Sequence, residues 1–325
     1  MDFAEHLPYL IHPDKIYELN SKRWLGVSEE LRSANDTILD CQIKCPDHQQ
    51  KGLWYYGGKD CQKCTAGVEA EIQRIHTILQ KRKLPFVLKL TQSLSAVGTN
   101  IVQDEKERSE VLQKIDEYLA AYLPRITKGN AHLYTTALVL SDFVPGKTMA
   151  LNFFVKRDGS PVFLGACHQL ATGESGRQAT AITYADQAKW ETKYHSTLQK
   201  IGKALNEEGY YGAVGADIME DEEGRLFTID LNVRTPLSLV LYLLRGHFND
   251  KRGMGMSLVY ECVMLKISRE ELEERFAKEF AEARIVLLGS TRMGKKEQWA
   301  YGMVVAGEDQ KALDKLSERI LEFEA

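Results

Sequence analysis

Apolar residues recur along the chain with two different spacings, and the two spacings alternate. Steps of three and four residues predict helices over 13–34, 68–79, 111–122, 190–205 and 309–323. Short apolar runs predict strands at 86–90, 133–140, 148–155, 161–167, 211–219, 225–232, 284–289 and 299–306. Because short turns join several consecutive strands, we expect an α/β or α+β fold with much antiparallel sheet.

Composition narrows the class of protein. The chain has 325 residues, a net charge of −4 and 44% hydrophobic residues, so it is long enough for more than one domain. Positive charge does not gather into the stripe that a nucleic acid needs, and no apolar run approaches the ~20 residues of a membrane span. The first residues, MDFAEHLPYLIHPDK, lack the pattern of a signal peptide. We therefore expect a cytoplasmic protein that binds neither nucleic acid nor membrane.

One predicted strand pair places polar side chains together. Asp230, Asn232 and Arg234 alternate with apolar residues, and Asp217 lies in the preceding strand. Since alternate residues of a strand share a face, two carboxylates and an amide oxygen are expected on one side, a donor set that suits Mg²⁺. The alternative is a solvent-exposed hairpin edge on which Arg234 only neutralises Asp230.

A lysine within an apolar strand is a second candidate. Lys89 lies in Phe86–Leu90, and a loop of small residues, 93–99, follows it. An ammonium group and loop N–H groups can together bind a phosphate chain, although the sequence is not a P-loop. The alternative is an edge lysine whose stem lies on apolar surface beside an ordinary turn.

In this order, these features resemble the ATP-grasp superfamily over residues 12–245. The series consists of Lys22, Lys89 with its loop, the strand–hinge–strand unit Leu138–Phe154, Asp217, and Asp230-x-Asn232-x-Arg234. The nearest likeness is to carboxylate–amine ligases, in particular to uncharacterised fungal ATP-grasp domain proteins. The resemblance implies an ATP-grasp fold in which a nucleotide is held between two lobes with largely antiparallel sheets.

The resemblance also implies roles for individual residues. Lys22 and Lys89 would contact the ATP phosphates, and the loop with Ser95 and Gly98 would cover them. The hinge residues Ser141, Asp142, Phe143 and Val144 would bind adenine through the backbone. Asp217, Asp230 and Asn232 would bind Mg²⁺, while Arg234 and Lys89 would act on the reacting phosphoryl group.

The implied reaction activates a small-molecule or amino-acid carboxylate as an acyl phosphate, which an amine-type nucleophile then attacks. Two alternatives remain open at this point. One is a phosphotransferase that stops at the phosphorylated product, and the other is a nucleotide-binding or zinc-stapled scaffold without turnover.

The same resemblance suggests three regions. We expect an N-terminal helical segment with a cysteine-rich insert at 1–83, a small or lid lobe at 84–144, and a large lobe with a C-terminal strand–helix extension at 145–325. Members of the superfamily usually begin with a further α/β domain that helps to bind the carboxylate. Because this sequence starts close to the Lys22 helix, a partner domain or chain is expected to replace it.

Four cysteines gather near the N-terminus in two close pairs. Cys41 and Cys45 precede Cys61 and Cys64 with spacings typical of structural Zn²⁺ sites, and His48 is a spare ligand. The sequence therefore predicts a structural Zn²⁺ site. Unligated thiols in a mobile insert are the main alternative, and a redox Cys-x-x-Cys pair is less well supported because no thioredoxin-like context surrounds it.

Overall fold

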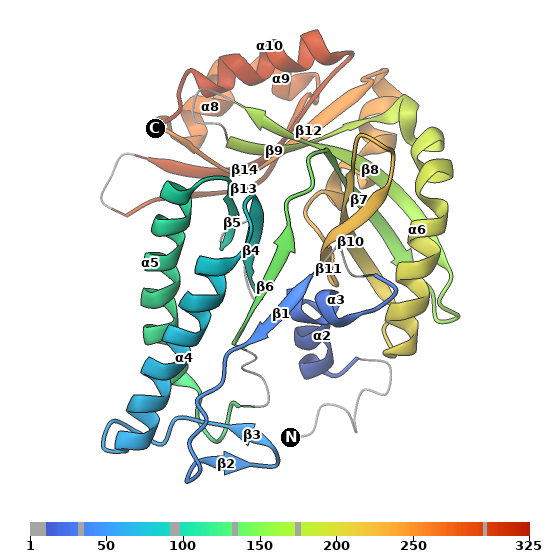
Figure 1. The fold of residues 1–325 in the computed structure, drawn as a ribbon. Coiled ribbons are helices and arrows are strands. Elements are labelled where there is room, and N and C mark those ends of the chain that lie inside the picture. The colour runs from blue at the N-terminus through green and yellow to red at the C-terminus, as the bar shows by residue number, and fades with distance from the viewer. Residues whose placement is uncertain (1–10, 32–35, 92–97, 132–135, 173–176, 295–297) are drawn as a thin grey trace. The chain divides into compact units, whose positions relative to one another are not determined.

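The computed structural model describes residues 11–31, 36–91, 98–131, 136–172, 177–294 and 298–325 (Figure 1). The chain divides into two compact units, one formed by residues 1–146 and 221–231 and the other by 147–220 and 232–325. Residues 1–83 and 84–144, which the resemblance suggests as separate regions, both fall within the first unit.

The first unit contains a sheet with the strand order β1-β6-β4-β5, in which all neighbours are antiparallel. These strands are β1 (Thr37–Asp40), β4 (Phe86–Leu90), β5 (Thr99–Val102) and β6 (Ala137–Asp142). The predicted strand 86–90 is confirmed, and β6 covers the second half of the predicted strand 133–140. A short hairpin of β2 (Gln49–Gln50) and β3 (Leu53–Trp54) stands apart from this sheet.

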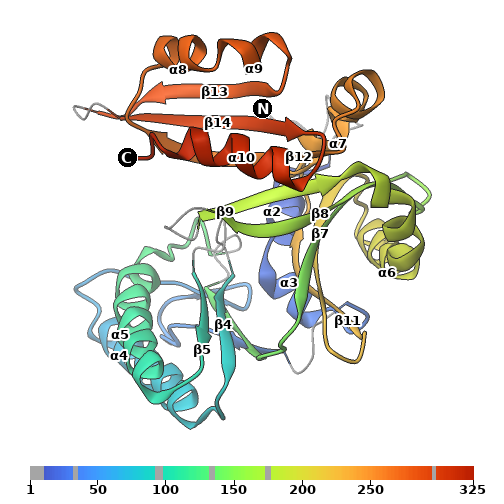
Figure 2. The same cartoon turned by 90° about the horizontal axis from the view of Figure 1, so that it is seen from above.

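Two long helices, α4 (Gln62–Lys81) and α5 (Glu105–Tyr122), lie side by side against the sheet (Figures 1 and 2). Their apolar faces and the strands form one core, in which Ile75, Leu79 and Leu119 are fully buried. Burying a side chain of this size stabilises the fold by about 1.5–3 kcal/mol. A 3₁₀ turn, Leu123–Arg125, follows α5 at Pro124.

The N-terminal helix is shorter than predicted. Two helices, α2 (Pro13–Leu19) and α3 (Lys22–Val27), replace the single helix expected over 13–34. The interruption has a local cause, because Asn20 caps the end of α2 and Ser21 begins α3 by accepting a hydrogen bond from Arg23 N at 3.2 Å. The prediction of one continuous helix was therefore wrong.

In the second unit, the strands β10, β7, β8, β9, β12, β14 and β13 follow one another in the sheet, again with antiparallel neighbours. Their bounds are β7 (Lys147–Val155), β8 (Pro161–Thr172), β9 (Arg177–Thr183), β10 (Gly212–Glu220), β12 (Met256–Leu265), β13 (Ile285–Arg292) and β14 (Trp299–Gly307). The predicted dominance of antiparallel sheet is confirmed. The strands β9 and β12 were not predicted.

The helices of the second unit pack on this sheet. They are α6 (Gln187–Glu207), α7 (Leu239–Leu243), α8 (Arg269–Arg275), α9 (Ala277–Ala281) and α10 (Gln310–Leu321), with a 3₁₀ turn at Tyr184–Asp186 and a π-helical turn at Gly246–Asp250. The predicted helices 190–205 and 309–323 correspond to α6 and α10. Among the described residues, no helix combines the length and the apolar character that crossing a bilayer requires.

The acidic loop before β11 (Leu226–Asn232) is built around one buried carboxylate. Asp221 is 8% exposed and accepts hydrogen bonds from Glu223 N at 3.0 Å and Arg225 N at 2.8 Å. Burial alone would raise the pKa of Asp221, but the hydrogen bonds from Arg225 outweigh it and lower the pKa. This turn holds the chain in position as it enters β11.

Candidate functional site

Lys22 and Asp230 form an ion pair between the start of α3 and β11. Lys22 Nζ lies 3.0 Å from Oδ1 and 3.1 Å from Oδ2 of Asp230. The lysine side chain is only 9% exposed, against 27% for the aspartate. A cation in the first turn of a helix faces the positive end of the helix dipole, and a nearby carboxylate offsets this unfavourable interaction. The two residues are 208 positions apart in the sequence.

Lys89 of β4 contacts Ile229, the residue that precedes Asp230 in β11. Its Nζ atom donates a hydrogen bond of 2.7 Å to the backbone oxygen of Ile229. The start of α3 is tied to the same region, because Lys22 N donates to the backbone oxygen of the buried Thr91, just after β4. The first unit thus brings both predicted phosphate-binding lysines to adjacent residues of β11.

The loop after β4 is described only at its end. Ser95 lies outside the described residues, whereas Gly98 has a φ of +82° and its oxygen accepts a hydrogen bond of 2.9 Å from Leu90 N. A Cβ atom at this position would lie 2.8 Å from the Leu90 side chain. Glycine is needed here for its backbone conformation and for the close approach of Leu90.

The predicted hinge begins within β6 and continues into the loop before β7. Ser141 is buried and its hydroxyl donates a hydrogen bond to Asp36, while Asp142 Oδ1 accepts one of 2.6 Å from Arg82 Nη2. Phe143 and Val144 follow the end of β6 and are half-buried. Polar side chains therefore fix the backbone that leads into this loop. Sequence reasoning did not identify Asp36 or Arg82, because both lie far from the hinge in the sequence.

Three predicted site residues belong to the second unit. Asp217 is half-buried in β10 between the buried Ala216 and Ile218. Asn232 Oδ1 accepts a hydrogen bond of 2.9 Å from the exposed Arg234. A Cβ atom on Gly215 would lie 3.5 Å from Asn232 Cβ. Gly215 and Asp217 are two residues apart in β10 and therefore lie on the same face of the strand. The close approach of Gly215 and Asn232 thus supports the prediction that Asn232 lies on the same face as Asp217.

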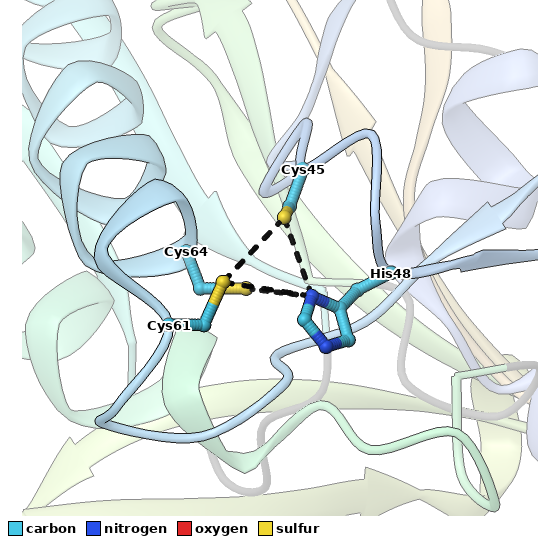
Figure 3. Close-up of side chains that lie close together, drawn as sticks. All are labelled: Cys45, His48, Cys61 and Cys64. Atoms are coloured by element: carbon cyan, nitrogen blue, oxygen red, sulfur yellow. Dashed lines mark hydrogen bonds between the residues drawn. The ribbon is translucent and has the colours of Figure 1, made fainter.

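The cysteine region forms a group of four potential metal ligands. Cys45, His48, Cys61 and Cys64 offer atoms that all lie within 4.8 Å of one another, and Figure 3 shows the side chains pointing toward a common point. Cys41 lies outside the group. The backbone N–H of Cys41 donates a hydrogen bond to Thr136 O, just before β6, and its Sγ lies 3.4 Å from Leu39 O. Burial raises the pKa of the Cys41 thiol to about 12. His48 therefore takes the place that the spacing suggested for Cys41.

A cavity of about 270 Å³ also lies in the first unit, lined among others by Arg23, Asp40, Leu53 and Trp54. Among the described residues, none of those predicted to bind the nucleotide or Mg²⁺ lines it. It is therefore separate from the lysine–aspartate cluster.

Comparison with known proteins gives one family match. The model of a family described as L-aspartate–L-methionine ligase, ATP grasp, matches residues 68–232, which are just over half of the 325-residue chain. No match was found among curated proteins.

Solved structures of several ligases resemble the chain at low sequence identity. An L-amino acid ligase from Bacillus licheniformis is 13% identical with a TM-score of 0.57, and the match covers 99% of this chain and 76% of that chain. A phosphoribosylamine–glycine ligase from Thermotoga maritima is 12% identical with a TM-score of 0.55, covering 97% and 80%. At such identities the similarity is one of fold.

The chain spans only part of the length of the solved structures that it matches. It spans 60% of the biotin carboxylase domain of the 2-oxoglutarate carboxylase from Hydrogenobacter thermophilus, which it matches over 78% of its own length with 14% identity and a TM-score of 0.48.

Proposed function

Because the chain belongs to the ATP-grasp family described as L-aspartate–L-methionine ligase, we propose that it uses ATP and Mg²⁺ to join a carboxylate to an amine. Membership of this family confirms the superfamily and the fold that the sequence resemblance implies. We further propose that both substrates are amino acids, with L-aspartate and L-methionine as the first pair to test, since the family description names them.

One observation of the structure carries the proposal. Two lysines from separate elements, Lys22 of α3 and Lys89 of β4, contact adjacent residues of β11. Gathering two ammonium groups costs Coulomb energy unless an anion lies nearby. Asp230 supplies one negative charge, and the phosphates of ATP would supply more.

The proposed Mg²⁺ ligands are Asp230 and Asn232 of β11 with Asp217 of β10. Their donor atoms are all oxygen, the type that Mg²⁺ prefers. Asp230 already turns both carboxylate oxygens toward a cation, the ammonium of Lys22. When bound, Mg²⁺ would neutralise charge on the phosphate oxygens.

The chain's own residues then act by position and charge. Lys22 and Lys89 would hold the phosphates, and the backbone of the hinge after Ser141 would bind adenine. The substrate carboxylate attacks the γ-phosphorus and ADP leaves, which gives an acyl phosphate. The amine then attacks the acyl carbon, so that an amide forms, inorganic phosphate leaves and the amine proton passes to solvent. Arg234 would stabilise the negative charge that develops during these steps.

The proposal is tested by incubating the purified chain with ATP, Mg²⁺, L-aspartate and L-methionine, and by measuring ADP and dipeptide by mass spectrometry. We expect both products in equal amounts, and neither when Mg²⁺ is omitted. A wider amino-acid panel identifies the substrates if this pair is inactive. Formation of ADP with a stable phosphorylated carboxylate and no amide would instead indicate a phosphotransferase. Absence of ADP with every amino-acid pair would contradict the proposal.

A further inference from the structure

Four side chains from two short stretches of the first unit converge where the chain has little regular structure. Cys45 and His48 precede the β2–β3 hairpin, and Cys61 and Cys64 lie at the start of α4 (Figure 3). Three sulfur atoms and one imidazole nitrogen make a donor set that suits Zn²⁺ better than Mg²⁺ or Ca²⁺.

The distances match tetrahedral coordination. Zn–S bonds of about 2.3 Å and a Zn–N bond of about 2.0 Å place sulfur atoms about 3.8 Å apart and sulfur about 3.5 Å from nitrogen. The Sγ atoms of Cys45 and Cys61 are 3.9 Å apart. His48 Nδ1 lies 3.3, 3.7 and 3.4 Å from the Sγ atoms of Cys45, Cys61 and Cys64 respectively. One atom from each of the four residues can therefore bind the same ion.

The backbone presents these ligands through tight turns. His48 N donates to Cys45 O at 3.0 Å, and Cys61 N donates to Gly58 O at 3.2 Å. Between them, Lys51 and Gly52 both have positive φ angles, 49° and 81°, as a two-residue hairpin requires. The hairpin returns the chain from the first ligand pair toward the second.

Gly57 fits the histidine closely. A Cβ atom at Gly57 would lie 2.0 Å from Nε2 and 2.1 Å from Cε1 of His48, so only glycine leaves room for the ring. The neighbouring Tyr55 ring packs edge-on at 5.4 Å between centroids. Together these contacts hold Nδ1 toward the sulfur atoms. Gly57 N also donates a hydrogen bond to Cys64 Sγ at 3.3 Å, which fixes the position of that sulfur atom.

We propose that Cys45, His48, Cys61 and Cys64 bind one Zn²⁺ ion with a structural role. Four protein ligands leave no open position for a substrate or a water, which is typical of structural rather than catalytic zinc. With three thiolates and a neutral imidazole, the occupied site would carry one residual negative charge, and the neighbouring Lys63, whose ammonium lies 2.8 Å from Asp47, forms a pair without net charge.

The ion would stabilise the stretch between β1 and α4. Its regular structure is limited to β2 and β3, which are two residues long each, and a hairpin of that size is not stable on its own. The ligands Cys45 and Cys64 are buried in the core of the first unit with Ile43 and Val68. Zinc binding would thus join the start of α4 to this core, so that the free energy of binding contributes to folding.

The experiment measures metals in the full chain purified with reductant and without chelator. We expect about one zinc per chain in the wild type and in Cys41→Ser, whose buried thiol lies outside the group, and none in Cys64→Ser. When Co²⁺ replaces Zn²⁺, the wild type and Cys41→Ser should both show the visible absorption bands of tetrahedral cobalt with thiolate ligands. This readout also decides the matter if Cys64→Ser does not fold, because it needs only the wild type and the Cys41→Ser control.

Three results would overturn the proposal. The first is wild-type protein without metal that binds no Co²⁺ as a tetrahedral complex. The second is a Cys45–Cys61 disulfide, detected by peptide mass analysis, in protein that was expressed in a reducing cytoplasm and purified without reductant. The third is loss of zinc from Cys41→Ser while Cys64→Ser retains it.

Discussion

Lys22 Nζ lies within 3.1 Å of both carboxylate oxygens of Asp230, although 208 positions separate the two residues. Both side chains are shielded from solvent, the lysine more than the aspartate. A pair with this geometry is stronger than a surface ion pair, because water screens it less. It also sets the direction in which the carboxylate faces, and the proposed Mg²⁺ site depends on that direction.

Substitution of Asp230 tests this site. Asp230→Asn keeps the size of the side chain but removes its charge, so we expect Mg²⁺-dependent ADP formation to fall by about 100-fold or more. Glu18→Gln is the matched control, since it removes one carboxylate from the exposed Lys15–Glu18 pair. We expect the control to keep full activity. Equal rates for wild type and Asp230→Asn would contradict the assignment.

Lys89 is expected to act on ATP. Lys89→Met removes an ammonium that contacts Ile229 O, and we expect kcat/KM for ATP to fall by about 100-fold while circular dichroism stays unchanged. Lys106→Met provides the control, because Lys106 is an exposed lysine of α5 that lies 4.0 Å from Glu110. If both variants behave alike, Lys89 has no special role in ATP use.

Gly98 is expected to matter for stability. Alanine at this position must adopt a φ of +82° and displace the Leu90 side chain, which together should cost about 1–3 kcal/mol. Gly129→Ala is a suitable comparison, because the nearest atom to a Cβ there is 4.0 Å away. Urea unfolding followed by tryptophan fluorescence measures both. A Gly98→Ala variant as stable as Gly129→Ala would show that the loop adjusts without strain.

Thiol reactivity provides a test of the cysteine region. Cys262 is exposed and should react first with a thiol reagent, whereas burial protects Cys41 and Cys167 and raises the pKa of each to about 12. A chelator that removes zinc should expose about three further thiols, those of Cys45, Cys61 and Cys64. If chelation leaves the number of reactive thiols unchanged, these cysteines do not bind a removable metal.

The order of the main helices and strands could be predicted from the sequence. Long stripes of apolar residues three and four positions apart indicate helices, whereas short continuous apolar runs indicate strands. Several features could not be predicted, and three of them show the physical reasons. The break at Asn20 and Ser21 depends on local caps that interrupt an otherwise helical pattern. The strand Thr37–Asp40 has only four residues, two of them polar, and the apolar run Met256–Leu265 does not distinguish a buried strand from a helix.

The candidate site was predictable only as a set of residue types. Alternation along the strand picked out Asp230 and Asn232, but no local pattern pairs Lys22 with Asp230 across the sequence. In the cysteine region, spacing alone indicated Cys41. The structure instead brings in His48, because the hydrogen bond from Cys41 N to Thr136 O holds Cys41 at the end of β1, outside the group. Such choices depend on tertiary contacts, which no sequence period encodes.

The most direct test of the proposed chemistry follows oxygen atoms. The amino acid whose carboxylate reacts is labelled with ¹⁸O in that group and is turned over with unlabelled ATP, and the inorganic phosphate is analysed by mass spectrometry. Attack of the carboxylate on the γ-phosphorus predicts one ¹⁸O atom in each phosphate released during amide formation. Unlabelled phosphate accompanying the amide, or label found in AMP, would contradict an acyl phosphate and with it the account of the site.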